Sequence, residues 1–248
     1  MKEHYFVIGD IHGQITMLEQ LLQKWNREKQ QLVFVGDLGD RGENPKACFE
    51  RARQLVLEEG AICLRGNHEE MLLNFMNHPE QYIENYAMNG GLVTINSFID
   101  EEIEGKKPKE LAEKLQQQAP WLKPFIESLP LKVEWGNYLI VHAGVDLTIK
   151  DWKETSNQNL VWIREGFYDQ PNNTGKTIIF GHTVTAMLNE KQSDASIWLS
   201  GDGKIGIDGG AVYGGSLHGI VIDQSGMIEQ YSIPNTGYAF NNLLRKES

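Results

Sequence analysis

The sequence predicts an α/β protein, in which buried strands alternate with helices along the chain. The first observation behind this fold class is a set of short apolar runs, rich in Val, Ile, Phe and Tyr, that are typical of buried strands. The second is that helical patterns separate several of these runs. The runs are Tyr5–Ile8, Leu32–Val35, Ala61–Leu64, Tyr138–Val141 and Thr177–Phe180.

Three helices are predicted in the first third of the chain. Asn44-Pro45 is a typical cap followed by a first-turn proline, which predicts a helix from this point to Glu59. The stretch 69–77 (EEMLLNFMN) predicts another helix directly after a GNH turn. Before both of these, four apolar residues repeat at helical spacing and share one face: Ile15, Leu18, Leu22 and Trp25.

The remainder of the chain has a different pattern. Residues 78–129 hold long polar and helical patterns, so we expect a mostly helical insertion packed beside the sheet, where it covers or narrows a site. The C-terminal third returns to short strands with close turns, which predicts an antiparallel second sheet. These strands are Ile197–Leu199, Ile205–Ile207, Gly219–Ile222 and Ile228–Ile233. We expect residues 1–235 to form a single domain and 236–248 to be a C-terminal tail.

Composition and charge exclude several classes of partner. The chain has 248 residues, 40% of them hydrophobic and 23% charged, which is typical of a globular protein. Its 23 Lys and Arg stand against 34 Asp and Glu, so the formal net charge is −11. An acidic protein lacks the basic surface that would attract a nucleic acid or an anionic membrane, so we expect neither as a partner.

The sequence also bears on the compartment. No apolar run approaches the ~18 residues of a membrane span. The N-terminus enters a strand without a signal region, which predicts a cytoplasmic protein. Cys48 and Cys63 lie inside apolar stretches; they could pair in an exported protein, but two buried free thiols agree better with a reducing cytosol.

Polar residues follow the predicted strands at the point where each strand ends. In an open α/β sheet, ligands bind at the carboxyl ends of the strands. Carboxylates mixed with imidazoles and an amide suit divalent Mn, Fe or Zn. The residues at these ends are Asp10, His12, Asp37, Asp40, Asn67, His68, His142 and His182.

Each of these residues has an alternative interpretation when it is taken singly. A lone Asp after a strand is often a helix cap, and a lone His is often a hydrogen-bonded core residue. Five strand ends with the same character favour the metal-ligand interpretation instead. His4, His78 and His218 lie outside these motifs and are expected to be surface or structural residues.

Five motifs together resemble the phosphoprotein phosphatase family of metallophosphoesterases, in particular its bacterial serine/threonine phosphatase-like branch. They are GDIHG (9–13), GDLGDRG (36–42), RGNHE (65–69), HAG (142–144) and GHT (181–183), in the family's order and at similar spacing. The resemblance covers residues 9 to about 215. It implies a four-layer α/β/β/α sandwich.

The resemblance also implies a centre of two divalent metal ions, with Mn²⁺ preferred and Fe or Zn as alternatives. Asp10 and His12 would bind the first ion, and Asp37 would bridge both. A metal-bridging hydroxide would then attack phosphorus directly and in line, without a phosphoenzyme. The ligands implied for the second ion are Asn67, His142 and His182.

Four further residues have roles implied by the resemblance. His68 would protonate the leaving oxygen, oriented by Asp40. Arg41 and Arg164 would bind phosphate oxygens through their planar guanidinium groups. For Arg164 the alternative is a surface ion pair with the adjacent Glu165.

The chain departs from the family pattern at two glycines. Gly39 stands where the family often has a bulky apolar residue, so we expect different local packing. Gly209, in IDGG (207–210), stands where related sequences usually read IDTG, and we expect a more flexible loop there. Tyr213 borders the leaving-group pocket or packs in the core, and Glu69 is interpreted as a helix-start acid or a partner of the ligands rather than a ligand.

The leading functional hypothesis is a serine/threonine protein phosphatase, acting on a phosphorylated protein. The first alternative is a hydrolase that cleaves dinucleoside polyphosphates such as diadenosine tetraphosphate symmetrically, since the same centre performs both reactions. A non-catalytic scaffold that binds phosphorylated partners would lack a ligand or the proton donor, and all are present here. A nuclease would need a basic surface. The residues do not specify an oligomeric state.

Overall fold

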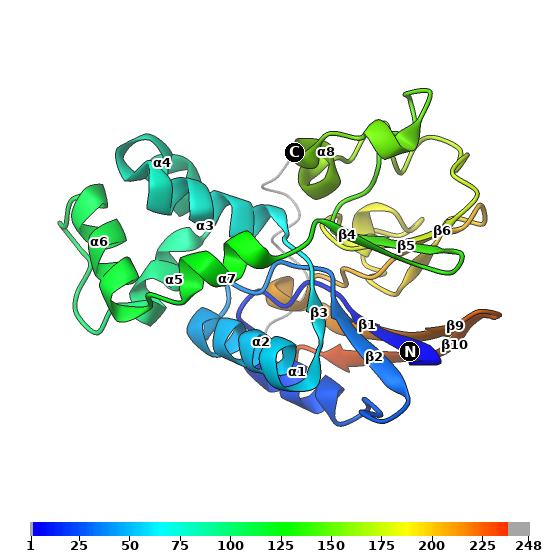
Figure 1. Cartoon of the computed structure of the whole chain (residues 1–248), viewed down its shortest axis with the longest axis horizontal. Helices are drawn as coiled ribbons and strands as arrows, with labels where there is room; N and C mark the ends of the chain where they lie inside the picture. Colours follow the sequence, from blue (N-terminus) through cyan, green and yellow to red (C-terminus); the bar gives the residue numbers. More distant parts are fainter. Residues whose placement is uncertain (1, 238–248) are drawn as a thin grey trace.

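The computed structural model describes residues 2–237, and its strands form two sheets (Figure 1). The first sheet has the strand order β10-β9-β1-β2-β3, in which β1, β2 and β3 are parallel and the two C-terminal strands pair antiparallel. Its strands are β1 (His4–Ile8), β2 (Gln30–Phe34), β3 (Ile62–Cys63), β9 (Ser216–Asp223) and β10 (Gly226–Pro234).

The second sheet has the order β4-β5-β6-β8-β7. Its three central strands are parallel, and an antiparallel strand pairs at each edge. Its strands are β4 (Lys132–Trp135), β5 (Tyr138–Val141), β6 (Thr177–Phe180), β7 (Trp198–Leu199) and β8 (Lys204–Gly206).

The expectation that the C-terminal strands form a second, antiparallel sheet of their own is wrong. The strand over residues 204–206 enters the second sheet parallel to β6, whereas β9 and β10 extend the first sheet beside β1. The short strands look alike in sequence because each is apolar and followed by a close turn. Which sheet a strand joins depends on pairing with residues far away in the chain, and the local pattern does not encode it.

Four layers result from the packing of these sheets. The sheets face each other across an apolar core that is rich in β-branched residues, such as Val7, Val33 and Ile179. Helices α1 (Ile15–Leu22) and α2 (Pro45–Glu59) cover the outer face of the first sheet, and α8 (Asn157–Trp162) lies on the outer side of the second (Figure 1). The four-layer α/β/β/α sandwich is therefore confirmed.

The helices predicted in the first third are present with shifted ends. α1 ends at Leu22, so Trp25 lies in the turn that follows, buried against the same core. α2 begins as predicted, because the Asn44 side chain accepts a hydrogen bond from the Ala47 N–H and Pro45 occupies the first turn. α3 (Asn67–Asn77) starts two residues earlier than predicted.

The segment 78–129 contains four helices, which Figure 1 shows extending away from the sheets. They are α4 (Pro79–Met88), α5 (Gly91–Phe98), α6 (Pro108–Gln118) and α7 (Leu122–Ser128). We propose that they form an insertion within a single domain. Of the predicted tail 236–248, only residues 236 and 237 are described, and the rest lies outside the described residues.

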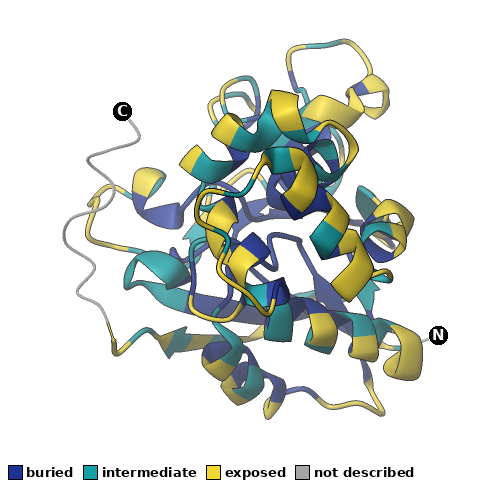
Figure 2. Cartoon of the chain, turned by 90° about the vertical axis from the view of Figure 1, so that its left-hand side faces the viewer, coloured by how far each residue is buried: buried dark blue, intermediate teal, exposed yellow. Residues whose placement is uncertain are grey.

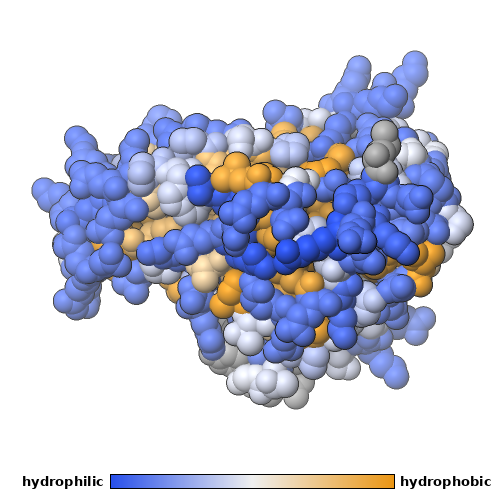
Figure 3. All heavy atoms as spheres, turned by 60° about the horizontal axis from the view of Figure 1, so that its bottom comes forward, coloured by the Kyte–Doolittle hydropathy of each residue, from blue (hydrophilic) through white to orange (hydrophobic). Residues whose placement is uncertain are grey.

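Burial follows the layers. Figure 2 shows the inner strands buried and the helices exposed along their outer faces, whereas the edge strand β10 is intermediate to exposed. The face drawn in Figure 3 is mostly hydrophilic, with hydrophobic residues in separated patches. Among the described residues, no helix has the length and apolar character to cross a membrane.

Both cysteine thiols should resist modification in the folded protein. Cys48 and Cys63 are free and buried, and burial raises the pKa of each thiol, so the reactive thiolate is scarce at neutral pH. A thiol-specific disulfide reagent should therefore react only as fast as the structure opens. The measurement is the absorbance of the chromophore that the reagent releases, with and without denaturant. In denaturant, two equivalents of thiol per chain should react at once. A fast equivalent from the native protein would contradict this prediction.

Candidate metal centre

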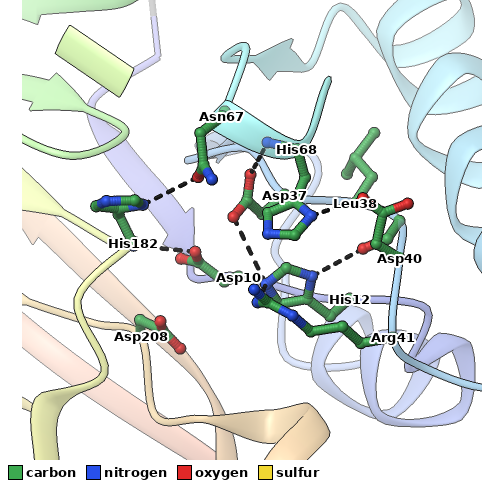
Figure 4. A network of polar contacts seen from close by, with 12 residues as sticks. Asp10, His12, Asp37, Leu38, Asp40, Arg41, Asn67, His68, His182 and Asp208 are labelled. Atoms are coloured by element: carbon green, nitrogen blue, oxygen red, sulfur yellow. Dashed lines mark hydrogen bonds and ion pairs between the residues drawn. The ribbon is translucent and has the colours of Figure 1, made fainter. Parts of the chain in front are cut away.

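The polar residues predicted at the strand ends meet where the two sheets abut. Asp10 follows β1 and Asp37 follows β2 of the first sheet, whereas His142 follows β5 and His182 follows β6 of the second. Asn67 opens α3 directly after the β3 loop. All are buried. Figure 4 shows the labelled side chains of this set turned toward one another, so the structure places together the residues that the sequence singled out.

Asp37 occupies the centre of this arrangement. It belongs to two groups of potential metal ligands, one with His12 and His68 and one with His142 and His182. The ligand atoms of each group lie within 4.8 Å of one another. Asp37 Oδ2 is 3.5 Å from His12 Nε2, and Asp37 Oδ1 is 3.5 Å from His142 Nε2. Each carboxylate oxygen of Asp37 thus lies near a histidine of a different group.

Backbone carbonyls hold one ring nitrogen of each histidine. His12 Nδ1 is 2.8 Å from the Gly39 oxygen, and His142 Nδ1 is 3.0 Å from the Val35 oxygen. His182 uses its other nitrogen, with Nε2 3.2 Å from the Trp162 oxygen. A carbonyl accepts, so these ring nitrogens carry the protons. The remaining nitrogen of each ring is left with a lone pair facing the cluster.

These lone pairs converge in a way that suits a cation. Asn67 Oδ1 lies 2.9 Å from both His142 Nε2 and His182 Nδ1, so three acceptor atoms meet without a proton between them. The histidines do not separate these acceptors by taking up a proton, because burial lowers the pKa of His142 to about 4 and that of His182 well below its ordinary value. Asp10 Oδ1 is also buried and has no hydrogen-bond partner among the described residues. The donor set therefore fits metal ions.

The charge of the site supports the same conclusion. Burial raises the pKa of Asp37 to about 8 and that of Asp10 well above its usual range, and repulsion from Asp208 adds to both. Carboxylates buried together are stable as anions only beside positive charge. Two divalent ions among these ligands would supply that charge.

Glu69 binds backbone groups and is not directed at the cluster. Its carboxylate accepts hydrogen bonds of 2.8 Å each from the N–H groups of Asp37, Leu38 and Gly66. It therefore fastens the loop after β2 to the start of α3. This contact supports the interpretation of Glu69 as a partner of the ligands rather than a ligand.

Asp208 is a site residue that the sequence reasoning missed. It follows β8 and is buried, and it lines a cavity together with His12 and Asp37. Its Oδ1 accepts a hydrogen bond of 2.9 Å from Gly210 N–H. The signal was present, because Asp208 comes directly after the predicted strand Ile205–Ile207, as Asp10 comes after its own strand. The glycine-rich turn IDGG (207–210) predicted a flexible loop at this position instead of a site residue.

His68 and Asp40 form a buried pair beside the metal ligands. His68 Nδ1 is 2.6 Å from Asp40 Oδ2, and the His68 ring meets the His12 ring edge to face at 4.7 Å. Burial raises the pKa of Asp40 to about 7, against the opposing effect of hydrogen bonds from Thr94 and Tyr86. The other ring nitrogen of His68 is left to face the cavity that this residue lines.

Two arginines line the cavity. Arg41 Nη1 is 3.1 Å from His12 Nε2, and the guanidinium lies 5.5 Å from the centre of the Tyr213 ring. Arg164 Nη2 donates to the His182 carbonyl oxygen at 3.5 Å. No ion pair between Arg164 and Glu165 occurs in the described part of the chain, so the surface alternative for Arg164 is not supported. Tyr213 borders the cavity rather than the core.

The cavity itself has a volume of about 370 Å³ and opens beside the metal ligands. Its inner wall consists of the polar residues already described. Its outer wall includes Trp162, Asn89 and two exposed methionines, Met88 from the end of α4 and Met187 from the loop after β6. A charged floor with an apolar entrance results.

Five site residues other than glycine have left-handed backbone angles. Their φ values lie between 44° and 64°, a region that L-residues seldom occupy. Such strain persists only where the surroundings hold the chain, and it is common at functional sites. The residues are His12, Asp37, Asp40, Arg41 and His182.

The structure explains both departures from the family pattern. A Cβ on Gly39 would lie 2.5 Å from Cε2 of Phe49, so the Phe49 ring fills the space that a bulky residue would take. A Cβ on Gly209 would lie 2.5 Å from Nε2 of His218, a buried structural histidine whose ring nitrogens contact Ser232 and Ala195. The expectation of a flexible loop at Gly209 is wrong, because the glycine is required by close packing.

Comparison with known proteins agrees with the geometry. A family model described as calcineurin-like phosphoesterase matches residues 4–204. The chain is 30% identical over 219 residues to serine/threonine-protein phosphatase 1 of Salmonella typhimurium, covering 86% of this chain and 89% of that protein. It is 25% identical over 263 residues to the asymmetrical bis(5'-nucleosyl)-tetraphosphatase PrpE of Anoxybacillus flavithermus, with 94% of each chain covered.

A solved structure shares the fold. It is described provisionally as a diadenosine tetraphosphatase and matches with a TM-score of 0.63, at 20% sequence identity, over 96% of both chains. The family inferred from the five motifs is thereby confirmed. The chain belongs to the calcineurin-like phosphoesterase family, and it is a metal-dependent phosphoester hydrolase.

Proposed function

We propose that this protein is a serine/threonine protein phosphatase, and the charge of its cavity is the observation that carries the proposal. Two cationic side chains, Arg41 and Arg164, are present among the described lining residues. Two planar guanidinium groups offer paired donors for the oxygens of one phosphoryl group, and the described lining holds no further cationic side chain for a second phosphate. The volume of about 370 Å³ is at the lower end of the ~300–1,000 Å³ of small-molecule sites.

The apolar entrance also suits a polypeptide. Met88 is 88% exposed and Met187 52% exposed at the mouth of the cavity. Methionine is flexible and polarisable, and it adapts to different apolar side chains. A peptide could place its phosphorylated residue in the cavity while neighbouring side chains contact these methionines.

We further propose how the residues divide the metal-binding task. Asp10 and His12 would bind one ion, with Asp37 shared, and Mn²⁺ is the preferred metal, with Fe or Zn as alternatives. When bound, two such ions supply positive charge to the phosphoryl oxygens and an activated water as nucleophile. The remaining ligands, for the second ion, are Asn67, His142 and His182.

The other residues of the site bind substrate and move a proton. Arg41 and Arg164 would hold phosphoryl oxygens through paired N–H donors, which fixes the orientation of phosphorus. His68 would donate a proton to the serine or threonine oxygen as the P–O bond breaks. Asp40 orients the His68 ring through Nδ1, and its negative charge would oppose the burial that lowers the pKa of His68. The leaving alcohol then departs neutral.

A second candidate is the hydrolysis of dinucleoside polyphosphates, cleaved symmetrically. The name of the PrpE relative, an asymmetrical tetraphosphatase, favours this substrate class. The cavity argues against it, because the described lining offers no cationic side chain beyond Arg41 and Arg164 for the phosphates of a tetraphosphate bridge that would lie away from the metal ions. Asp208 adds a further buried carboxylate to the wall.

A comparison of two substrates in separate reactions tests the proposal. Metal-stripped protein is reconstituted with Mn²⁺ and given a phosphoserine peptide or diadenosine tetraphosphate in matched reactions, with products separated by chromatography. We expect phosphate release from the peptide to have the higher kcat/KM by at least about tenfold, a difference of ~1.4 kcal/mol in transition-state binding. Dominant formation of two ADP, or of ATP and AMP, would establish the nucleotide hydrolase instead. No turnover of either would leave the metal centre standing and overturn both proposed substrate classes.

A further inference from the structure

The helical insertion reaches the acid pair of the site through two hydroxyl groups. The Tyr86 hydroxyl, on α4, donates to Asp40 Oδ1 at 2.7 Å. The Thr94 hydroxyl, on α5, donates to the same oxygen. His68 Nδ1 faces the other oxygen, Oδ2. All four side chains are at least 98% buried, so water does not replace any of these contacts.

Thr94 holds the backbone of Asp40 as well as its side chain. The Asp40 N–H donates to Thr94 Oγ1 at 2.8 Å, while the Thr94 hydroxyl proton goes to the Asp40 carboxylate. Asp40 needs this support because its φ is 64°, a conformation that L-residues avoid. One threonine therefore fixes both the backbone conformation and the carboxylate of Asp40.

Packing keeps Tyr86 at its place. Its ring stacks on Phe75 of α3 at 5.7 Å between centres. The same ring covers Gly91, where a Cβ would lie 2.4 Å from ring atoms. Burial raises the pKa of the Tyr86 hydroxyl, so it keeps its proton and remains a donor. The Gly90 carbonyl accepts a hydrogen bond of 3.2 Å from Arg41 N–H, which joins the same turn to the phosphate-binding arginine.

The two carboxylate oxygens of Asp40 have different partners, which indicates that these hydrogen bonds orient the carboxylate as well as satisfy a buried acid. Both hydroxyls bind Oδ1, and among the described residues His68 alone binds Oδ2. Two donors on one oxygen fix the rotation of the carboxylate plane about the Cβ–Cγ bond. That rotation decides where Oδ2 points, and thus the angle of the His68 ring toward the cavity.

We propose that Tyr86 and Thr94 are positioning residues that hold the Asp40 carboxylate so that His68 is aimed at the leaving group. The helical insertion is then part of the hydrolytic machinery and does more than cover the site. This inference rests on the proposed function of His68 as proton donor.

The first test compares substrates that differ in their need for a proton. Tyr86→Phe and Thr94→Val each remove one hydroxyl at nearly constant shape. Since general acid catalysis contributes ~10²–10⁴-fold, we expect kcat on a phosphoserine peptide to fall about tenfold for each change. On p-nitrophenyl phosphate, whose leaving group needs little protonation, the loss should stay below about threefold, with KM unchanged on both substrates.

Three controls separate positioning from a merely structural role. Thr94→Ser keeps the hydroxyl and should restore the rate. Tyr82→Phe changes a half-buried tyrosine on the same helix, outside the Asp40 contacts, and should have no effect. In an Asp40→Asn background, either hydroxyl deletion should add less than about twofold, because effects that act through one group are not additive. Equal losses on both substrates, or multiplicative losses in that background, would overturn the inference.

A spectroscopic measurement keeps the two proposals distinguishable. The His68 Nδ1–H proton should give a low-field NMR signal that disappears in Asp40→Asn and shifts in Tyr86→Phe and Thr94→Val. An unchanged signal in both hydroxyl variants would overturn positioning even if the enzyme is active. A wild-type protein without phosphoester turnover would overturn the proposed function, while shifted signals would still support the positioning of His68.

Discussion

Asp37→Asn is expected to remove bound metal from both positions and to lower kcat by more than about 10³-fold, beyond the ~10²–10³ that loss of one transition-state hydrogen bond costs. The reason is that Asp37 belongs to both ligand groups, with one oxygen toward His12 and the other toward His142. The amide can still accept the hydrogen bond that Asp37 Oδ1 receives from His68 N–H, so the fold should persist. Metal content per chain, measured by elemental analysis, is the primary readout.

A stability measurement extends this prediction. Metal that binds only the folded state raises the melting temperature, and it should do so for the wild type but not for Asp37→Asn. Asp194→Asn is a matched control, since Asp194 is an exposed aspartate remote from the ligands, and this variant should keep two metals. Retention of both ions and near-normal turnover in Asp37→Asn would show that the centre is organised differently.

His68→Asn should have the second largest effect, and it should act on turnover without removing metal. Loss of a general acid lowers kcat by ~10²–10⁴-fold, and the loss should be greatest for phosphoserine and smallest for p-nitrophenyl phosphate. The measurement is kcat on both substrates together with metal content. It matters because His68 also lies within reach of His12 and Asp37 in one ligand group, so a ligand role is the competing assignment.

His12→Asn provides the matched comparison for His68. Both imidazoles are buried and stand 4.7 Å apart, yet the Nδ1 of His12 faces a backbone carbonyl and that of His68 faces a carboxylate. We expect His12→Asn to lose metal and His68→Asn to keep it. If His68→Asn lost its metal as well, the role of proton donor would be wrong.

The sequence predicts those features of the site that are encoded locally. Each of the motifs begins within two residues of the end of a strand and contains the polar residues that follow it, so the pattern alone places the proposed ligands at one edge of the sheets. Parallel strands bring such ends together whatever the order of the strands. The metal ligands and the α/β fold class follow from this rule. The ligands predicted in this way include Asp10, Asp37, Asn67, His142 and His182.

Features that depend on distant contacts cannot be predicted in this way. Tyr86 and Thr94 contact Asp40 across 46 and 54 residues, and neither lies in a motif. The distribution of the C-terminal strands between two sheets is likewise decided by pairing partners. Gly209 is explained by the Ser216 carbonyl and the His218 ring, which both approach it closely from β9. In each case the local sequence is compatible with several environments.

The position of the ligands at the junction of the two sheets has a consequence for the lifetime of the chain in a cell. Asp10, His12 and Asp37 extend from the first sheet and His142 and His182 from the second, so metal bound by the proposed ligands would tie the two halves of the sandwich together. Without it, the same junction buries carboxyl groups whose raised pKa values make the anionic form unfavourable there. The metal-free chain should open there first and be degraded faster by proteases, so that metal supply would set the abundance of this protein as well as its activity.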